Sequence, residues 1–211
     1  MAAKSSSGAA SKKPAAKSGA GKTATQTGPK TSTRSSAKTV STSKPAAAPV
    51  ASPTSEPGGL QAGDVAPAFK LPGAGGGHLS LAGLKGKKVV LYFYPKDDTS
   101  GCTKEAIEFN ALKDDFAEAG AVVVGVSPDG VKSHDKFREK YGLTFPLAAD
   151  EDKETLNAYG VWIEKSMYGK KYMGVDRSTF LIDAKGRVAR VWRKVKVPGH
   201  AEEVLAAARG L

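Results

Sequence analysis

The sequence predicts an α/β domain that follows a basic, disordered N-terminal tail. Two apolar runs, 88–94 and 121–126, are rich in β-branched and aromatic residues, which is typical of buried strands. Between them, Phe109, Leu112 and Phe116 recur at the spacing of one helix face. A strand, a helix and a second strand in this order predict a βαβ unit with a right-handed crossover.

Residues 1–60 differ in composition from the rest of the 211-residue chain. They carry eight lysines and Arg34 against one acid, Glu56, so they hold +8 of the net charge of +11, and they include no aromatic residue. Such a segment cannot bury enough apolar surface to offset the entropy of ordering its backbone, roughly 1–2 kcal/mol per residue. We therefore expect residues 1–60 to be disordered and residues 61–211, at +3, to form the folded domain.

Three interpretations of the tail are open. Its lysines, spaced as in Lys12-Lys13-Pro14-Ala15-Ala16-Lys17, resemble the tails of linker-histone-like proteins and predict non-specific nucleic-acid binding through phosphates. A solubilising linker without a partner is the second interpretation. An organelle transit peptide is the third, weakened by the single arginine. No run approaches the ~18 apolar residues of a membrane helix, so we expect no membrane partner.

The first elements of the domain follow from short-range patterns. Two short strands, 69–71 and 78–81, are expected on either side of a glycine-rich turn. The helix between the two buried strands is expected over 101–119, and Gly120 ends it.

The C-terminal half predicts three helices, a short strand and a hairpin. The helices are expected at 131–141, 150–159 and 201–208, and the strands at 145–148, 178–182 and 187–192. Asp183-Ala184-Lys185-Gly186 joins the last two strands and is a strong hairpin signal. Parallel strands that end in an antiparallel hairpin indicate a thioredoxin-like fold, with a central mixed sheet flanked by helices. A flavodoxin-like doubly wound sheet is the alternative, but it would not finish with a hairpin.

The only cysteine, Cys102, lies where the first buried strand ends and the long helix begins. One cysteine excludes a disulfide framework, a CxxC pair and a thiolate zinc cluster within one chain. With Thr99 or Ser100 as N-cap, the sulfur falls in the first helical turn, where free N–H groups and the helix dipole favour the nucleophilic thiolate. From its position alone, Cys102 is either a reactive thiol or a small buried hydrophobe.

The residues around this cysteine resemble a known family. Pro95-x-x-x-Thr99-x-x-Cys102 is similar to the active-site motif of the peroxiredoxins. The surrounding segments 92–97 and 101–103 resemble the branch called peroxiredoxin Q, or bacterioferritin-comigratory protein.

A second block of sequence supports the same resemblance. It consists of Tyr159-Gly160-Val161-Trp162 and the segment 172–183, which includes Asp176-Arg177-Ser178. The resemblance runs from about Gly63 to the C-terminus and does not cover the tail. It implies a thioredoxin-like peroxiredoxin domain that needs no cofactor and no metal.

The resemblance implies a thiol-dependent peroxidase that reduces hydrogen peroxide and organic hydroperoxides. Cys102 would attack the peroxide and become a sulfenic acid. Thr99 would offer its hydroxyl to the sulfur or the peroxide, and Pro95 would shield the pocket from water. Arg177 matches the family's arginine at the start of a late strand, and its guanidinium would steady the thiolate and the peroxide oxygens.

One position departs from the pattern of the branch. Many members carry a second, resolving cysteine five residues after the first, where this chain has Ile107. With one thiol, the sulfenic acid needs an external reductant, namely a thioredoxin, a glutaredoxin or a low-molecular-weight thiol. We therefore expect a one-cysteine peroxiredoxin, as a monomer or weak dimer. A bacterial cytoplasm is its expected location, with a nucleus or a plastid as alternatives.

The remaining candidates carry less chemistry. His78, His134 and His200 have no metal-ligand spacing, so we expect them on the surface or in loops. Trp162 and Trp192 are expected as core or rim aromatics rather than a platform for nucleic-acid bases. The competing function is a nucleic-acid-associated protein that acts through its basic tail, with the peroxidase domain as an accessory.

Overall fold

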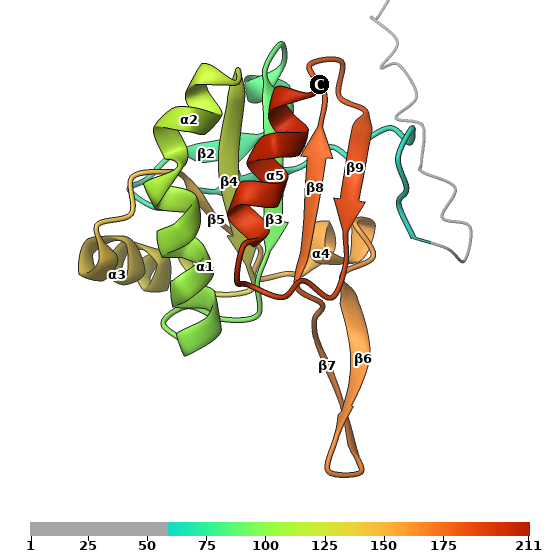
Figure 1. The fold of residues 1–211 in the computed structure, drawn as a ribbon. Helices are drawn as coiled ribbons and strands as arrows, with labels where there is room; N and C mark the ends of the chain where they lie inside the picture. Colours follow the sequence, from blue (N-terminus) through green and yellow to red (C-terminus); the bar gives the residue numbers. More distant parts are fainter. Residues whose placement is uncertain (1–58) are drawn as a thin grey trace, which may run out of the picture. The chain divides into compact units, whose positions relative to one another are not determined.

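Residues 59–211 are the part of the chain that the computed structural model describes, and a five-stranded sheet lies at their centre (Figure 1). The strands are β1 (Lys70–Pro72), β2 (His78–Ser80), β3 (Lys88–Phe93), β4 (Ala121–Ser127), β5 (Leu147–Ala149), β6 (Trp162–Met167), β7 (Lys170–Val175), β8 (Ser178–Ile182) and β9 (Val188–Trp192). The helices are α1 (Ser100–Ala111), α2 (Lys113–Glu118), α3 (Val131–Tyr141), α4 (Glu154–Ala158) and α5 (His200–Arg209), with a 3₁₀ turn, η1 (Ala82–Leu84). The disorder predicted for residues 1–60 lies outside the described residues, apart from Gly59 and Leu60.

The strand order of the central sheet is β5-β4-β3-β8-β9. β3 pairs in parallel with β4, and β4 with β5, whereas β8 runs antiparallel to both β3 and β9. This arrangement confirms the predicted thioredoxin-like mixed sheet and excludes the flavodoxin-like alternative, whose sheet is parallel. Phe93, the last residue of β3, lies opposite Ser178, the first residue of β8. The segments that follow β3 and precede β8 therefore meet at one edge of the sheet.

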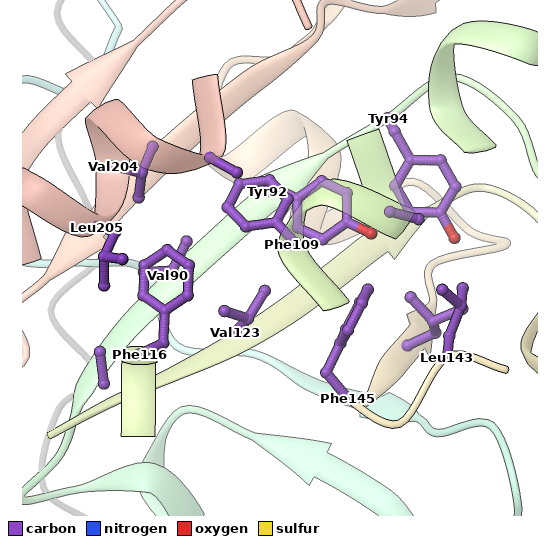
Figure 2. Packing of buried hydrophobic residues seen from close by; sticks show 14 of the residues in the cluster. Val90, Tyr92, Tyr94, Phe109, Phe116, Val123, Leu143, Phe145, Val204 and Leu205 are labelled. Atoms are coloured by element: carbon purple, nitrogen blue, oxygen red, sulfur yellow. The ribbon is translucent and has the colours of Figure 1, made fainter. Parts of the chain in front are cut away.

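The core consists of two apolar layers, one on each face of the sheet. Successive side chains of β3 point to opposite faces, so Val90 and Tyr92 join one layer while Leu91 joins the other. Figure 2 shows the first layer, in which Phe109 of α1 and Phe116 of α2 pack near the strand. Tyr92 and Phe109 are stacked with ring centroids 4.8 Å apart. Helix α1 is thus held against the sheet by fully buried aromatic rings.

The prediction of one continuous helix over 101–119 is wrong. The helix is divided at Leu112 into α1 and α2. The backbone N–H of Leu112 still bonds the carbonyl of Glu108, and its own carbonyl accepts from Phe116, so the interruption is a local bend. On either side of the bend, Phe109 and Phe116 both reach the core, with ring centroids 5.9 Å apart. Hydrophobic spacing locates the helical face but does not report such a bend.

Most of the other predicted elements are confirmed within a few residues. The helix at 131–141 and the strand at 178–182 match α3 and β8 at both ends. The helix predicted at 150–159 is shorter, because α4 begins only at Glu154. Strands β6 and β7 were not predicted, because their largely exposed side chains give no clear apolar alternation. Within residues 59–211, none of the helices has the length and apolar character that crossing a membrane requires.

Candidate active site

Cys102 is the third residue of α1, at the end of the loop that follows β3. Thr99 precedes the helix with extended dihedral angles, φ −93° and ψ 149°, as an N-cap residue should. The predicted placement of the sulfur in the first helical turn is therefore confirmed. The side chain is also buried, at 1% exposure. The first turn of a helix presents free backbone N–H groups and the positive end of the helix dipole.

Arg177 approaches the sulfur of Cys102 from the segment that precedes β8. It directly precedes β8, and the antiparallel pairing of β8 with β3 brings it next to the start of α1. Its Nη2 donates a hydrogen bond to Sγ of Cys102 across 3.3 Å. Two residues 75 positions apart are thus brought together by strand pairing, as the resemblance implied.

Glu105 is a third member of the site that the sequence analysis missed. Its Oε2 accepts a hydrogen bond from Nη1 of Arg177, and its side chain is 1% exposed. Burial raises the pKa of Glu105 to about 7, although Arg177 opposes the shift. Burial alone would lower the pKa of Arg177, but Glu105 and Cys102 hold it above its ordinary value. The signal that could have found Glu105 is its spacing, three residues after Cys102 on the same helix face.

The other two predicted site residues lie in the loop before α1. Pro95 is half-buried and follows the end of β3. Thr99 is exposed, and its Oγ1 donates a hydrogen bond to the carbonyl of Lys96 across 3.1 Å rather than to the sulfur. Because that bond uses the hydroxyl proton, the oxygen keeps its capacity to accept a hydrogen bond.

A buried hydrogen-bond network fixes this loop. Asp97 accepts from the hydroxyl of Tyr94 at 2.7 Å and lies 2.8 Å from Nδ1 of His134 on α3. Its own backbone N–H donates to Asp129 at 2.8 Å. Burial alone would raise the pKa of Asp97, but the hydrogen bond and charge of His134 bring it below the ordinary value of 3.8. The loop that presents Cys102 is therefore tied to α3 and to the loop after β4, and the bond from Tyr94 joins two residues within it.

The surface or loop positions predicted for the histidines are wrong for two of the three. His134 is fully buried, and His200 is 5% exposed, whereas His78 is exposed. His200 Nε2 lies 2.8 Å from Oγ1 of Thr179, and burial lowers the pKa of His200 to about 4. Both buried rings have polar partners from distant segments. The prediction was based on the lack of metal-ligand spacing in the sequence, which does not report such contacts.

Residues 62–191 match the model of the AhpC/TSA family. The chain belongs to the AhpC/TSA family. Peroxiredoxin Bcp of Bacillus subtilis is 49% identical over 146 residues, which are 69% of this chain and 93% of that protein. Peroxiredoxin Bcp of Xanthomonas campestris is 51% identical over 144 residues, which are 67% of this chain and 90% of that protein. The chain is therefore a peroxiredoxin of the Q, or Bcp, branch, and a thiol-dependent peroxidase.

A solved structure shows the same relationship in three dimensions. The peroxiredoxin Q of Xanthomonas campestris matches this peroxiredoxin with a TM-score of 0.65 at 50% identity, over 67% of this chain and 90% of that one. Variants of that protein with one or the other of two cysteines replaced by serine have also been solved. This peroxiredoxin has one cysteine, so it differs from that relative in the number of its thiols.

The raised pKa of Glu105 predicts a pH dependence of stability. The folded protein keeps this proton up to about pH 7, whereas an ordinary carboxyl loses it near 4.5, so its contribution to the free energy of unfolding falls as the pH rises between these values. Glu105→Gln should remove this fall, as measured by urea unfolding between pH 5 and pH 8. The exposed Glu118→Gln is the control and should keep the wild-type slope. Equal slopes in wild type and Glu105→Gln would contradict the assignment.

The network around Asp97 predicts a large loss of stability on truncation. Asp97→Ala leaves Tyr94 and His134 without their buried partner and should cost roughly 2–4 kcal/mol in urea unfolding at pH 7. Because the pKa of Asp97 is lowered, the difference from wild type should shrink only as the pH falls below about 3.8. Asp115→Ala is the matched control.

The control residue, Asp115, is half-exposed and pairs with Arg209 on the surface. Its truncation should cost less than about 1 kcal/mol. An equal cost for the two variants would show that burial of the Asp97 network adds nothing.

Proposed function

We propose that Cys102 is the nucleophile with which this peroxiredoxin reduces hydrogen peroxide and organic hydroperoxides. The observation that carries the proposal is the 3.3 Å hydrogen bond from Arg177 to its sulfur at the start of α1. The thiolate attacks one peroxide oxygen, and the O–O bond breaks. The second oxygen leaves as hydroxide or alkoxide and takes up a proton, which leaves a sulfenic acid on Cys102. Alkyl peroxide reduction is described for the Xanthomonas campestris relative, which supports organic hydroperoxides as substrates.

Arg177 has two tasks in this proposal. Its guanidinium donates to the sulfur, so it stabilises the thiolate before attack and the charge that spreads over the oxygens during it. Glu105 acts as a positioning residue, because it holds the other arm of the guanidinium and so fixes its direction. A planar side chain with donors on both arms suits this bridge between sulfur and carboxylate.

Thr99 and Pro95 complete the proposed site. The Thr99 oxygen, whose proton is engaged by the carbonyl of Lys96, can accept a hydrogen bond from the O–H of an incoming peroxide. Pro95 has no N–H and adds an apolar, half-buried surface beside the loop. These contacts would orient the O–O bond toward Sγ of Cys102.

The sulfenic acid is recycled by an external thiol, because the chain has no second cysteine. A donor thiol condenses with the sulfenic acid to give a mixed disulfide and water. A second thiol then attacks the donor sulfur and releases Cys102 as thiolate, while the donor leaves as a disulfide. Since Cys102 is 1% exposed, a protein thiol reaches Sγ only when the first turn of α1 moves outward.

The other predictions about the whole molecule rest on the sequence. Nucleic-acid binding was predicted for residues 1–60, nearly all of which lie outside the described residues, and it stays a prediction. The family match begins at residue 62, which supports the predicted start of the domain at 61. The monomer or weak dimer also stays a prediction. The relatives compared are bacterial proteins, which supports the bacterial location that was expected first.

Replacing the only thiol tests the function directly. Cys102→Ser should lower peroxide consumption to the rate seen without enzyme, with dithiothreitol as reductant, because an alcohol is not a nucleophile toward peroxide here. Wild-type protein treated with equimolar peroxide should carry a dimedone adduct on Cys102 by mass spectrometry. Peroxide turnover by Cys102→Ser, with a native circular dichroism spectrum, would refute the proposal.

The role of Arg177 predicts a loss of peroxidase activity even when lysine keeps the positive charge at this position. Arg177→Lys should lower kcat/KM for hydrogen peroxide about 100-fold, since one ammonium cannot bond Cys102 and Glu105 together. Stopped-flow kinetics of the reduced enzyme gives this constant. Arg190→Lys, on the exposed part of β9, is the matched control and should stay within about threefold of wild type. Equal rates for both variants would remove Arg177 from the mechanism.

A further inference from the structure

Strands β6 and β7 form a separate arm at one end of the domain. They pair only with each other among the described residues, from Trp162 opposite Val175 to Met167 opposite Lys170. The turn at the tip has positive φ at both Tyr168 and Gly169, 51° and 76°, as tight hairpin turns require. Six residues of strand give the arm a length of about 20 Å. Figure 1 shows it extending beyond the end of the sheet at which α1 begins.

The two faces of the arm differ in charge. Directly opposite residues share a face, so one face carries Ile163, Lys165, Met167, Lys170, Tyr172 and Gly174. We call this set the basic face, because it holds two lysines and no acid. On the opposite face, Glu164 pairs with Lys171 at 3.0 Å and cancels its charge. The arm therefore carries a net positive charge on one side only.

The exposed apolar side chains of the domain are concentrated on this arm. Four of the seven large hydrophobic side chains that residues 59–211 expose belong to it: Met167, Tyr168, Tyr172 and Met173. Their exposed fractions run from 45% for Tyr172 to 98% for Tyr168. Gly174 leaves room for the rings and stems beside it, since a Cβ there would lie 3.3 Å from Tyr172 and 3.6 Å from Lys165. Flexible and aromatic side chains are typical of protein contact surfaces.

The base of the arm is part of the active-site edge. β7 ends at Val175, and Arg177 follows two residues later with its Nη2 on the sulfur of Cys102. The backbone N–H of Asp176 bonds the carbonyl of Val161 at 2.7 Å, which closes the base of the hairpin. A protein that brings its thiol to Cys102 must approach this edge, and an arm of about 20 Å next to Arg177 lies in its path.

We propose that the β6–β7 arm is the docking surface for a protein dithiol that reduces Cys102. The partner fits this surface if its thiols lie in an apolar patch that carries an acidic side chain, which would face the exposed Lys170, whereas the ammonium of Lys165 donates to the carbonyl of Val175. This inference rests on the proposed function, which requires an external thiol. It adds the place at which a protein donor binds.

Charge argues against a second copy of this chain as the occupant. A symmetric dimer sets the same patch of each subunit against the other. Pairing through the basic face would bring lysines of two copies together without an acid to neutralise them. Lys170 forms no ion pair with any of the described residues, so its charge is available to an acidic partner.

Kinetics with two reductants test the proposal. The variants are Met167→Ser/Tyr172→Ser, which removes apolar contact area, and Lys170→Glu, which reverses one charge. The matched controls are Val65→Ser, a residue 65% exposed elsewhere, and Lys185→Glu, exposed in the β8–β9 turn at the other end of the sheet. Each protein reduces hydrogen peroxide with thioredoxin, thioredoxin reductase and NADPH, and separately with dithiothreitol.

We expect the double variant to raise KM for thioredoxin about tenfold. Lys170→Glu should raise it severalfold and weaken its dependence on salt. Turnover with dithiothreitol should stay within about twofold of wild type for all variants, and the controls should match wild type with both reductants.

Three outcomes would overturn the proposal. The first is a KM for thioredoxin that neither variant changes, while dithiothreitol still supports turnover. The second is a wild-type enzyme that dithiothreitol recycles and thioredoxin does not. The third is a variant that shifts a dimer to a monomer in sedimentation velocity without changing KM. By contrast, wild-type protein that fails to turn over with dithiothreitol would contradict the proposed function itself.

Discussion

The rest of this site depends on the two contacts that the guanidinium of Arg177 makes with helix α1. The guanidinium lies between the sulfur of Cys102 and the carboxylate of Glu105, both of which are buried on α1. The sulfur and the carboxyl group are both buried and cut off from water, so a cation within hydrogen-bond distance stabilises the charged form of either group. The antiparallel position of β8 beside β3 supplies that cation at the sheet edge where α1 begins.

The loop before α1 is fixed by a second buried polar cluster. Asp97 joins Tyr94 of the segment after β3 to His134 of α3, while Asp129 holds the Asp97 backbone. Buried polar groups stabilise a structure only when each finds a partner, so this cluster favours one position of the loop. The site thus combines a buried sulfur at a helix terminus with a hydrogen-bonded loop beside it, while the β6–β7 arm stays outside the core.

Part of this arrangement could be predicted because it depends on neighbours in the sequence. The apolar run 88–94 and the spacing of Phe109 and Phe116 locate β3 and the helix that follows it. The motif from Pro95 to Cys102 locates the sulfur. The exposed strands β6 and β7 could not be found in this way, because residues that face solvent on both sides leave no periodic apolar signal.

The sequence by itself determined the fold class, the helix-terminal position of Cys102 and the need for an external thiol, since these follow from local patterns and from a count of one cysteine. Only the tertiary structure decided the partners of the buried polar groups. In the structure, Glu105 pairs with Arg177, and His134, which was expected on the surface, is buried in the core. The physical reason is that burial and pairing depend on strand order and helix packing, which join distant residues such as Cys102 and Arg177, 75 positions apart.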